Sequence, residues 1–216
     1  MSEKLSQISD LRQNYTLNSL LKENVSDNPF TQFAVWFEEA VNGDIYEPNA
    51  MILSTVSENQ PKSRTVLLKA LENDGFVFYS NYDSHKGEQM ADNNKVSLLF
   101  YWDRLQRQVR IEGTVSRISE EISTAYFQSR PRSSQLGAWA SKQSEVIENE
   151  QVLVEQLEFF TKKFEGIEVL PKPENWGGYV VNPNKIEFWQ GRPSRLHDRL
   201  VFDLVDSDWK ISRLSP

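Results

Sequence analysis

The stretch K-I-E-F-W-Q-G-R-P-S-R-L-H-D-R-L, residues 185–200, sets a charged turn between two apolar segments. Residues 186–189 and 200–204 alternate or run apolar, as β-strands do, so the charged part is predicted to join two strands. The stretch holds three arginines and one of the two histidines in the chain. An exposed loop is the alternative, because charged residues are exposed by default. The combination of arginine, histidine and tryptophan favours a ligand site. Guanidinium groups bind anions, imidazole exchanges protons near neutral pH, and the indole of Trp189 can cover a flat ring.

Composition restricts the class of protein. The 216 residues include no cysteine and two histidines, which excludes disulfides and thiolate metal sites and argues against any metal site. No segment approaches the ~20 apolar residues that span a bilayer, and the N-terminus has no targeting pattern, so we expect a cytoplasmic protein without a membrane partner. The net charge of −7 argues against nucleic acid as a partner, because backbone affinity needs a basic face. Local arginine clusters on an acidic chain suit small anionic ligands.

The N-terminal part divides at an aspartate-asparagine pair. Residues 1–27 are polar and weakly periodic and are expected to form a mobile arm, with Arg12 and Tyr15 in its one mixed basic and aromatic patch. Asn28 is then a predicted N-cap, and Pro29 suits the first position of the helix that follows. The arm is therefore expected to precede one domain, residues 28–216.

Strands dominate the predicted elements of this domain. Alternation predicts strands over residues 50–56, 64–69, 76–80, 95–102, 107–117, 178–181, 186–190, 200–205 and 209–212. Helices after the first are predicted over residues 84–93, 119–130 and 146–164. Gly113 inside a long strand suggests a bulge or a sharp bend. The predicted class is mainly β (α+β), a closed or nearly closed antiparallel barrel with peripheral helices.

Two cations flank the segment T-V-L-L. Arg64 and Lys69 are five residues apart, and an odd separation puts them on opposite faces of a strand unless a bulge intervenes. They suit two anions, or one anion and a ring edge, better than a single anion. Taken alone, each of the two residues is better read as an ordinary surface charge.

Tyr126, Arg130 and Ser134 recur at intervals of four residues. The first two share a helix face, Pro131 ends that helix, and Ser133 or Ser134 is predicted to cap a helix that begins at residue 135. Free N–H groups at a helix start, with an arginine and a tyrosine hydroxyl beside them, would form a phosphate pocket. The alternative is a helix junction with ordinary capping.

A weaker third set joins a strand end to a helix start. Tyr79 and Ser80 end a predicted strand, and Ser84, His85 and Lys86 begin the next helix, which suits a phosphate but is a common pattern. Three further polar residues, suited to the edge of a heterocycle, are Gln108, Gln143 and Ser144.

Several motifs in order resemble the pyridoxamine 5′-phosphate oxidase family. They are R-T-V-L-L-K (64–69), F-Y-S-N (78–81), Y-F-Q-S-R-P-R-S-S-Q-L-G-A-W (126–139) with S-K-Q-S (141–144), and I-E-F-W-Q-G (186–191) with R-L-H-D-R (195–199). The resemblance implies an FMN-binding split β-barrel that works as a homodimer. It further implies oxidation of pyridoxamine or pyridoxine 5′-phosphate to pyridoxal 5′-phosphate, with O2 reduced to H2O2 and ammonia released from the amine.

The resemblance also implies roles for individual residues. Those expected to bind FMN are Arg64, Thr65, Val66, Leu67, Leu68, Lys69, Tyr79, Ser80, Lys86, Gln108, Gln143, Ser144, Trp189 and Arg199. Those expected to hold the substrate phosphate are Lys69, Tyr126, Arg130 and Ser134. Arg195, Leu196 and His197 are expected over the substrate ring, with Arg195 and His197 as the catalytic pair, and Arg12 and Tyr15 as a lid. His85 stands where the family commonly has arginine, so its part in binding the flavin phosphate is open.

Two other functions share part of this pattern. A non-enzymatic flavin- or pyridoxal-phosphate-binding module would share residues 64–69 but is expected to lack the Arg195/His197 and Tyr126/Arg130/Ser134 sets. A flavin reductase that uses a nicotinamide cofactor would have little need of the second phosphate pocket. Both sets are present, so the oxidase is favoured.

Overall fold

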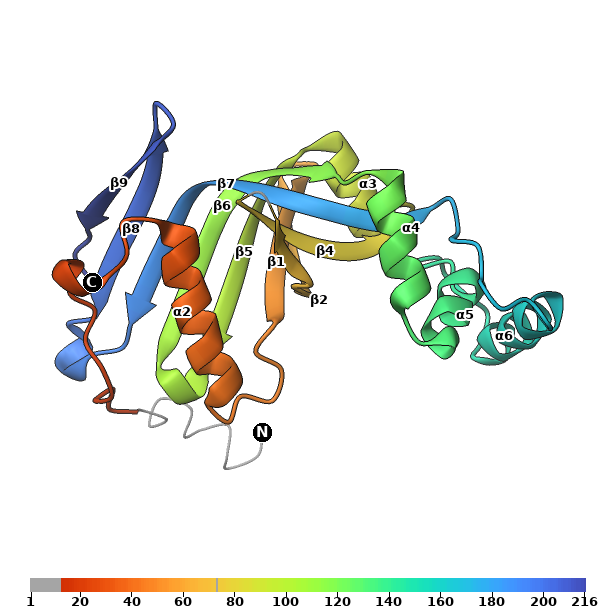
Figure 1. Cartoon of the computed structure of the whole chain (residues 1–216), viewed down its shortest axis with the longest axis horizontal. Coiled ribbons are helices and arrows are strands. Elements are labelled where there is room, and N and C mark those ends of the chain that lie inside the picture. Colours follow the sequence, from red (N-terminus) through yellow and green to blue (C-terminus); the bar gives the residue numbers. More distant parts are fainter. Residues whose placement is uncertain (1–12, 73) are drawn as a thin grey trace. The chain divides into compact units, whose positions relative to one another are not determined.

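A computed structural model describes residues 13–72 and 74–216 of the chain. The described residues are mainly antiparallel strands with helices between them along the chain (Figure 1). The strands are β1 (Ala50–Ser57), β2 (Gln60–Leu67), β3 (Ala70–Glu72), β4 (Gly75–Asn81), β5 (Lys95–Trp102), β6 (Arg107–Arg117), β7 (Trp176–Gln190), β8 (Asp198–Val205) and β9 (Asp208–Arg213). The segments predicted as strands at 178–181 and 186–190 therefore belong to one long strand, β7.

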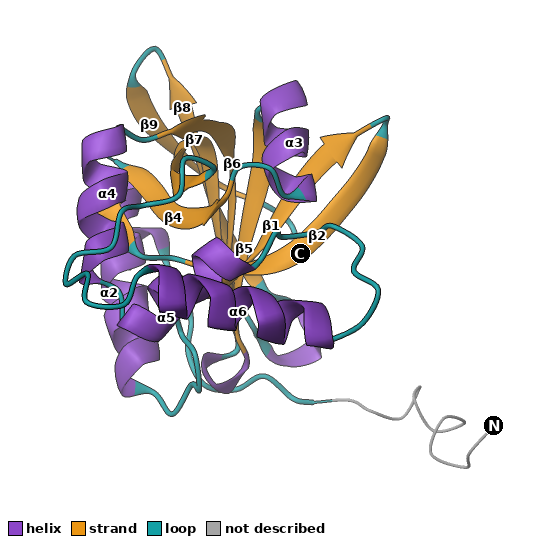
Figure 2. Ribbon diagram, turned by 90° about the vertical axis from the view of Figure 1, so that its right-hand side faces the viewer, coloured by secondary structure: helices purple, strands orange, loops and turns teal. Residues whose placement is uncertain are grey.

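The described residues also form helices, which are purple in Figure 2. The α-helices are α2 (Pro29–Asn42), α3 (His85–Asp92), α4 (Glu120–Ser129), α5 (Arg132–Ala140) and α6 (Gln151–Lys163). Short 3-10 turns are η2 (Lys22–Asn24), η3 (Asp103–Leu105) and η4 (Pro193–Arg195).

The chain forms two compact units. The first comprises the described residues up to Pro48 with Leu99–Ile111 and Lys185–Pro216, and the second comprises Asn49–Leu98 and Glu112–Asn184. Strands β5, β6 and β7 contribute residues to both units. The hydrogen-bonded strand order is β2-β1-β5-β6-β7-β4-β3, with β8 beside β7 and β9 beside β8. This path ends at β2 and β3 and is not closed, which fits a split barrel rather than the closed alternative.

Helix α2 covers strands of the first unit with its apolar face. The Asn28 side chain accepts hydrogen bonds from the N–H groups of Phe30 and Thr31, which confirms the predicted cap. Phe33 is fully buried, and the ring of Trp36 meets that of Phe188 edge to face at 5.2 Å. The aromatic residues of this helix therefore serve the core, as their spacing predicts.

The charged stretch that opened the sequence analysis is a turn in the first unit. Strand β7 pairs with β8 from Lys185 opposite Asp203 to Gln190 opposite Asp198. Residues 191–197 connect them, so the predicted strand-turn-strand is confirmed.

The second unit departs from the predicted boundaries in three places. The strand predicted over residues 64–69 stops at Leu67, because the N–H of Leu68 donates to Asn49 and that of Lys69 donates to Val77. Helix α5 begins at Arg132 rather than at residue 135, so Ser134 lies in its first turn and is not its cap. The helix predicted from residue 146 begins at residue 151.

Gly113 is explained by a close backbone approach in the second unit. A Cβ built on this glycine would lie 2.3 Å from the carbonyl oxygen of Asn182 on β7. No larger residue fits between these strands without moving the backbone. The core under the helices of this unit consists of Phe127, Leu136, Phe164, Leu170 and Trp176.

Candidate functional site

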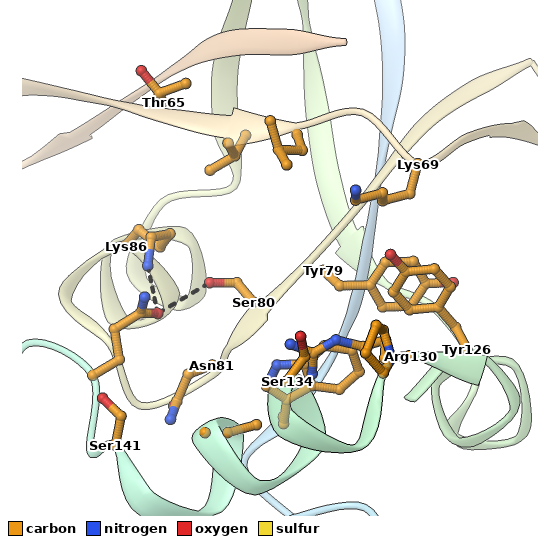
Figure 3. A pocket seen from close by; sticks show the side chains of 17 residues that line it. Thr65, Lys69, Tyr79, Ser80, Asn81, Lys86, Tyr126, Arg130, Ser134 and Ser141 are labelled. Carbon is orange, nitrogen blue, oxygen red and sulfur yellow. Dashed lines mark hydrogen bonds between the residues drawn. The ribbon is translucent and has the colours of Figure 1, made fainter. Parts of the chain in front are cut away.

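A cavity of about 670 Å3 opens in the second unit. Its walls come from the end of β2, strand β4, the start of α3 and the junction of α4 with α5 (Figure 3). Among the described residues that line it, Lys69, Lys86 and Arg130 are cations, and none is a carboxylate. The chain has a net charge of −7, so a cavity lined by positive and no negative side chains differs from the rest of the chain and favours an anionic ligand.

One end of the cavity is organised by Gln143. Lys86 Nζ donates to Gln143 Oε1 over 2.8 Å, and Ser80 Oγ donates to the same oxygen over 3.3 Å (Figure 3). Lys86 Nζ also donates to Ser84 Oγ over 3.0 Å. Burial and, after it, the charge of Arg64 together lower the pKa of Lys86 to about 8. The described hydrogen-bond partners of the Lys86 ammonium are neutral, so it has no counter-ion among them. A bound anion would supply one.

Arg64 lies behind this end and does not line the cavity. Its Nη1 donates to Thr55 Oγ1 over 2.8 Å, and its Nη2 donates to Gln89 Oε1 over 2.8 Å. Burial lowers the pKa of this guanidinium as well. These neutral acceptors hold the charge in place without cancelling it.

The other end of the cavity carries Lys69, Tyr126, Arg130 and Ser134 (Figure 3). The Arg130 guanidinium lies 4.7 Å from the ring centroid of Trp176, and its Nη1 is buried without a hydrogen-bond partner in the described chain. A buried unpaired donor is costly, and a bound anion would satisfy it. Ser134 sits in the first turn of α5, where helix N–H groups also favour negative charge.

Stacked aromatic rings support this second end. The rings of Tyr79 and Tyr126 are 3.7 Å apart and nearly parallel, and Tyr79 also stacks on Trp176 at 5.5 Å. Burial raises the pKa of Tyr79 to about 12, so its hydroxyl stays protonated and can donate a hydrogen bond. Burial likewise raises the pKa of Tyr126, although Arg130 opposes the shift.

Six described lining residues were not predicted as site residues, namely Asn81, Pro131, Gly137, Ala138, Ser141 and Trp176, and of these Trp176 brings a large aromatic ring. It begins β7 immediately before Gly177 and Gly178. A Cβ on Gly178 would lie 2.3 Å from Ile118 Cδ1 and 2.8 Å from Tyr79 Cε1, so the glycine leaves room for both side chains. A tryptophan followed by two glycines at a strand start is the pattern that could have pointed to a packed ring near this site.

A second group of predicted site residues lies in the first unit. The His197 ring is 4.6 Å from that of Trp189 and 5.7 Å from that of Tyr15. Its Nδ1 accepts a hydrogen bond of 3.1 Å from the backbone N–H of Arg192. Burial lowers the pKa of His197, and the charge of Arg195 lowers it further. Arg195 itself is exposed in the turn.

Arg199 is held by a buried carboxylate in the first unit. Its Nε and Nη2 donate to the two oxygens of Glu187 over 2.7 and 3.1 Å, and its Nη1 donates to the Ser215 carbonyl over 2.9 Å. This pairing raises the pKa of Arg199. Arg110 reaches the same Glu187 carboxylate at 3.2 Å.

The structure thus brings eleven of the predicted residues around one cavity, namely Thr65, Val66, Leu67, Lys69, Tyr79, Ser80, Lys86, Tyr126, Arg130, Ser134 and Gln143. Leu68 is buried and Ser144 exposed, and neither lines it. Gln108, Tyr15, Trp189, Arg195, Leu196, His197 and Arg199 belong to the first unit. Arg12 lies outside the described residues.

His85 does not share the cavity of Lys86. It lines a separate hollow of about 450 Å3 with Lys62, Glu88 and Asp92, among others. The described residues contain no group of three or more His, Asp or Glu side chains placed to hold a metal ion. Among the helices of residues 13–72 and 74–216, none is long and apolar enough to cross a membrane.

Comparison with known proteins gives a consistent result. Residues 37–160 match the family model described as pyridoxamine 5′-phosphate oxidase, and residues 176–216 match the pyridoxine 5′-phosphate oxidase C-terminal dimerisation region. The chain is 52% identical to the pyridoxine/pyridoxamine 5′-phosphate oxidase of Gloeothece citriformis, across 97% of this chain and 98% of that protein. It is 47% identical to the enzyme of the same name from Salinibacter ruber, across 98% of this chain and 100% of that one.

Solved structures show the same fold. PhzG from Burkholderia lata, in complex with tetrahydrophenazine-1-carboxylic acid, superposes with a TM-score of 0.86 at 25% identity, across 93% of this chain and 99% of that one. A pyridoxamine 5′-phosphate oxidase-related, FMN-binding protein from Nostoc punctiforme superposes with a TM-score of 0.69 at 17% identity, across 89% of this chain and 100% of that one.

Proposed function

The chain belongs to the pyridoxamine 5′-phosphate oxidase family, and we propose that it oxidises pyridoxamine 5′-phosphate and pyridoxine 5′-phosphate to pyridoxal 5′-phosphate. In this proposal O2 is the electron acceptor and H2O2 a product, and the amine substrate also releases ammonia. The enzyme is an oxidoreductase whose cofactor is FMN. The dimerisation region in residues 176–216 further supports a homodimer as the working form.

The observation that carries the proposal is the cavity with three cations and no carboxylate among its described lining residues. Its cations lie in two groups at opposite ends, Lys86 at one and Lys69 with Arg130 at the other (Figure 3). The reaction needs two phosphorylated molecules at once, the flavin and the substrate. Two separate anion-binding ends in one cavity suit that requirement.

The residues at the first end fit the phosphate of FMN. Lys86 is a half-buried ammonium that shares its Gln143 acceptor with Ser80, and Arg64 adds positive charge behind it. We assign these residues to hold the phosphate, and Thr65, Val66 and Leu67 to form the wall beside the cofactor. Once bound, the flavin supplies hydride acceptance and electron transfer to O2.

The residues at the second end fit the phosphate of the substrate. The buried Arg130 Nη1 has no partner in the described chain, and Lys69, Ser134 and the Tyr126 hydroxyl bring further donors to the same end. Holding the phosphate here fixes one end of the substrate, which restricts how its ring can turn. This set supports the oxidase over a flavin reductase or a binding module.

Arg195 and His197 are proposed as the residues that contact the substrate ring, with Leu196 between them and Arg12 and Tyr15 as a lid. Gln108, Ser144, Trp189 and Arg199 are proposed flavin ligands. The contact of Tyr15 with His197 supports the lid, because the arm already reaches the catalytic turn within the first unit. Binding, orienting and excluding water are the tasks that these side chains can perform.

The proposal is tested by loading the protein with FMN and adding pyridoxine 5′-phosphate without oxygen. Bleaching of the flavin band, its return in air and the formation of pyridoxal 5′-phosphate are the expected results. A flavin that stays oxidised with this substrate but is bleached by a reduced nicotinamide cofactor would instead identify a reductase. Arg195→Ala and His197→Ala are expected to retain FMN and lose turnover.

A further inference from the structure

The backbone of the catalytic turn determines which nitrogen of His197 carries a proton. The N–H of Arg192 points at His197 Nδ1 over 3.1 Å. A backbone N–H can only donate, so Nδ1 must present its lone pair. In a neutral imidazole with Nδ1 as acceptor, the single proton is on Nε2.

The turn that makes this contact is tightly fixed. Its first residue, Gly191, donates its N–H to the Gln106 carbonyl over 2.8 Å, and Leu196 N–H donates to the Pro193 carbonyl over 3.1 Å. Ser194 and Arg195 both have positive φ, 57° and 62°. A left-handed conformation is strained in a residue other than glycine, and such strain concentrates at functional sites. Two such residues in succession indicate that the geometry of this turn serves a function.

The surroundings of the ring also disfavour a second proton. The rings of Trp189 and Tyr15 lie against it, and Arg195 contributes positive charge. Asp198 is the adjacent carboxylate, but its oxygens accept from the Leu20 N–H and from Arg213. In the described chain, no hydrogen bond joins His197 to a carboxylate that would stabilise an imidazolium.

We infer that the Arg192 amide fixes His197 as a neutral imidazole with its proton on Nε2, so that His197 gives a hydrogen bond to an oxygen acceptor of the substrate. It cannot then be the base that takes a proton at Nε2, because that nitrogen is already protonated and Nδ1 is occupied. The role at the substrate rests on the proposed function, whereas the tautomer follows from the fold alone.

Nitrogen NMR of the FMN-loaded full-length protein with 15N-labelled histidine tests the tautomer. The chain has two histidines, so a His85→Gln variant assigns both sets of signals. At neutral pH we expect Nδ1 of His197 to be unprotonated and Nε2 protonated. Arg192→Ala keeps the backbone N–H and is expected to leave this pattern unchanged. A proton on Nδ1, or an imidazolium at neutral pH, would overturn the inference.

A comparison of two variants tests the donor role separately. The amide nitrogen of His197→Gln can replace an Nε2–H donor but cannot act as a base, so we expect at least about tenfold more turnover than in His197→Ala, the order of one hydrogen bond. Equal loss in both variants would contradict the donor role. If the wild-type protein has no oxidase turnover, the proposed function fails, while the NMR result still decides the tautomer.

Discussion

Lys86 Nζ donates to Gln143 Oε1 over 2.8 Å, which joins two residues 57 positions apart at one end of the cavity. Both were expected at the flavin from the sequence. The contact is neutral on the glutamine side, so the ammonium keeps its full charge for a ligand. With Arg64 behind it, the same end holds two positive charges, and burial lowers the pKa of Lys86 to about 8.

FMN affinity is therefore expected to fall at alkaline pH. In its proposed role, Lys86 attracts the FMN phosphate only while protonated, and that phosphate is already a dianion above pH ~7, since its second pKa is about 6. The affinity of the apo-protein should be nearly constant between about pH 7 and 8 and decrease above pH 8 by up to about tenfold per pH unit. Fluorescence titration with FMN from pH 6.5 to 9.5 measures this. In Lys86→Arg the decrease should disappear, because guanidinium stays charged throughout.

The same shift predicts how the stability of the apo-protein depends on pH. The pKa of Lys86 is lowered from 10.5 to about 8 in the fold. Between these values the unfolded chain binds more protons than the folded one, so the contribution of Lys86 to the free energy of unfolding rises with pH in this window. The test is urea denaturation of the wild-type protein and of Lys86→Met at pH 7.5 and 9.5. The free energy of unfolding of the wild-type protein minus that of the variant should be higher at pH 9.5 than at pH 7.5. An unchanged difference would contradict the shift.

Arg130→Met is expected to damage catalysis without a matching loss of stability. In the proposed role, Arg130 gives the substrate phosphate a charge-assisted hydrogen bond of about 1.5–3 kcal/mol, so its loss should raise KM for pyridoxine 5′-phosphate roughly 10–150-fold. Because Nη1 is buried without a described partner, its removal should leave Tm equal or higher. Steady-state kinetics and thermal unfolding supply the two measurements. Arg104→Met, at an exposed position in η3, is the control and should change neither.

Trp176 is expected to position Arg130 through the face of its ring. Trp176→Leu keeps an apolar side chain but removes the surface under the guanidinium, worth about 0.5–2 kcal/mol. KM should rise roughly 2–30-fold with kcat little changed, and Trp176→Phe should recover part of the loss. A fall in kcat alone, or the same KM in all three proteins, would exclude this role. Trp209→Leu is the matched control, because Trp209 lies in the first unit and packs on Phe30.

The sequence predicted what local rules determine. The Asn28 cap, the turn at residues 191–197 and the four-residue spacing of Tyr126 and Arg130 depend on neighbours in the chain, and the first two are confirmed. Lys69 was placed in a strand, but the long-range bonds of residues 68 and 69 to Asn49 and Val77 end β2 before it. The sequence predicts Ser133 or Ser134 as the cap of the next helix, whereas α5 already begins at Arg132.

The features that the sequence did not predict are those that depend on contacts between residues far apart in the chain. Trp176 meets Tyr79 and Arg130 only because β4 pairs with β7 and because α4 ends near them. The separation of His85 from the cavity depends on which side of α3 faces the Lys86 site. No spacing rule carries that information, since it is set by how the elements pack.

Glu187 should contribute more to stability than any surface ion pair in the same hairpin. Its carboxylate is 8% exposed and receives two hydrogen bonds from Arg199, whose side chain is 25% exposed, so Glu187→Gln leaves a poorly solvated cation without its charge partner. Loss of one member of a buried pair costs about 3–5 kcal/mol, and the partial exposure of Arg199 places the expectation near the lower end, about 3 kcal/mol. Asp203→Asn removes the partner of Lys185 on the same strands, where both side chains are about 40% exposed, and should cost under ~1 kcal/mol. Urea denaturation at one fixed protein concentration compares the two, because dimerisation makes stability depend on concentration. Equal losses of stability in the two variants would show that burial of the Glu187 pair adds nothing. If the double variant Glu187→Gln with Arg199→Met recovers stability, the unpaired cation is the cause of the loss.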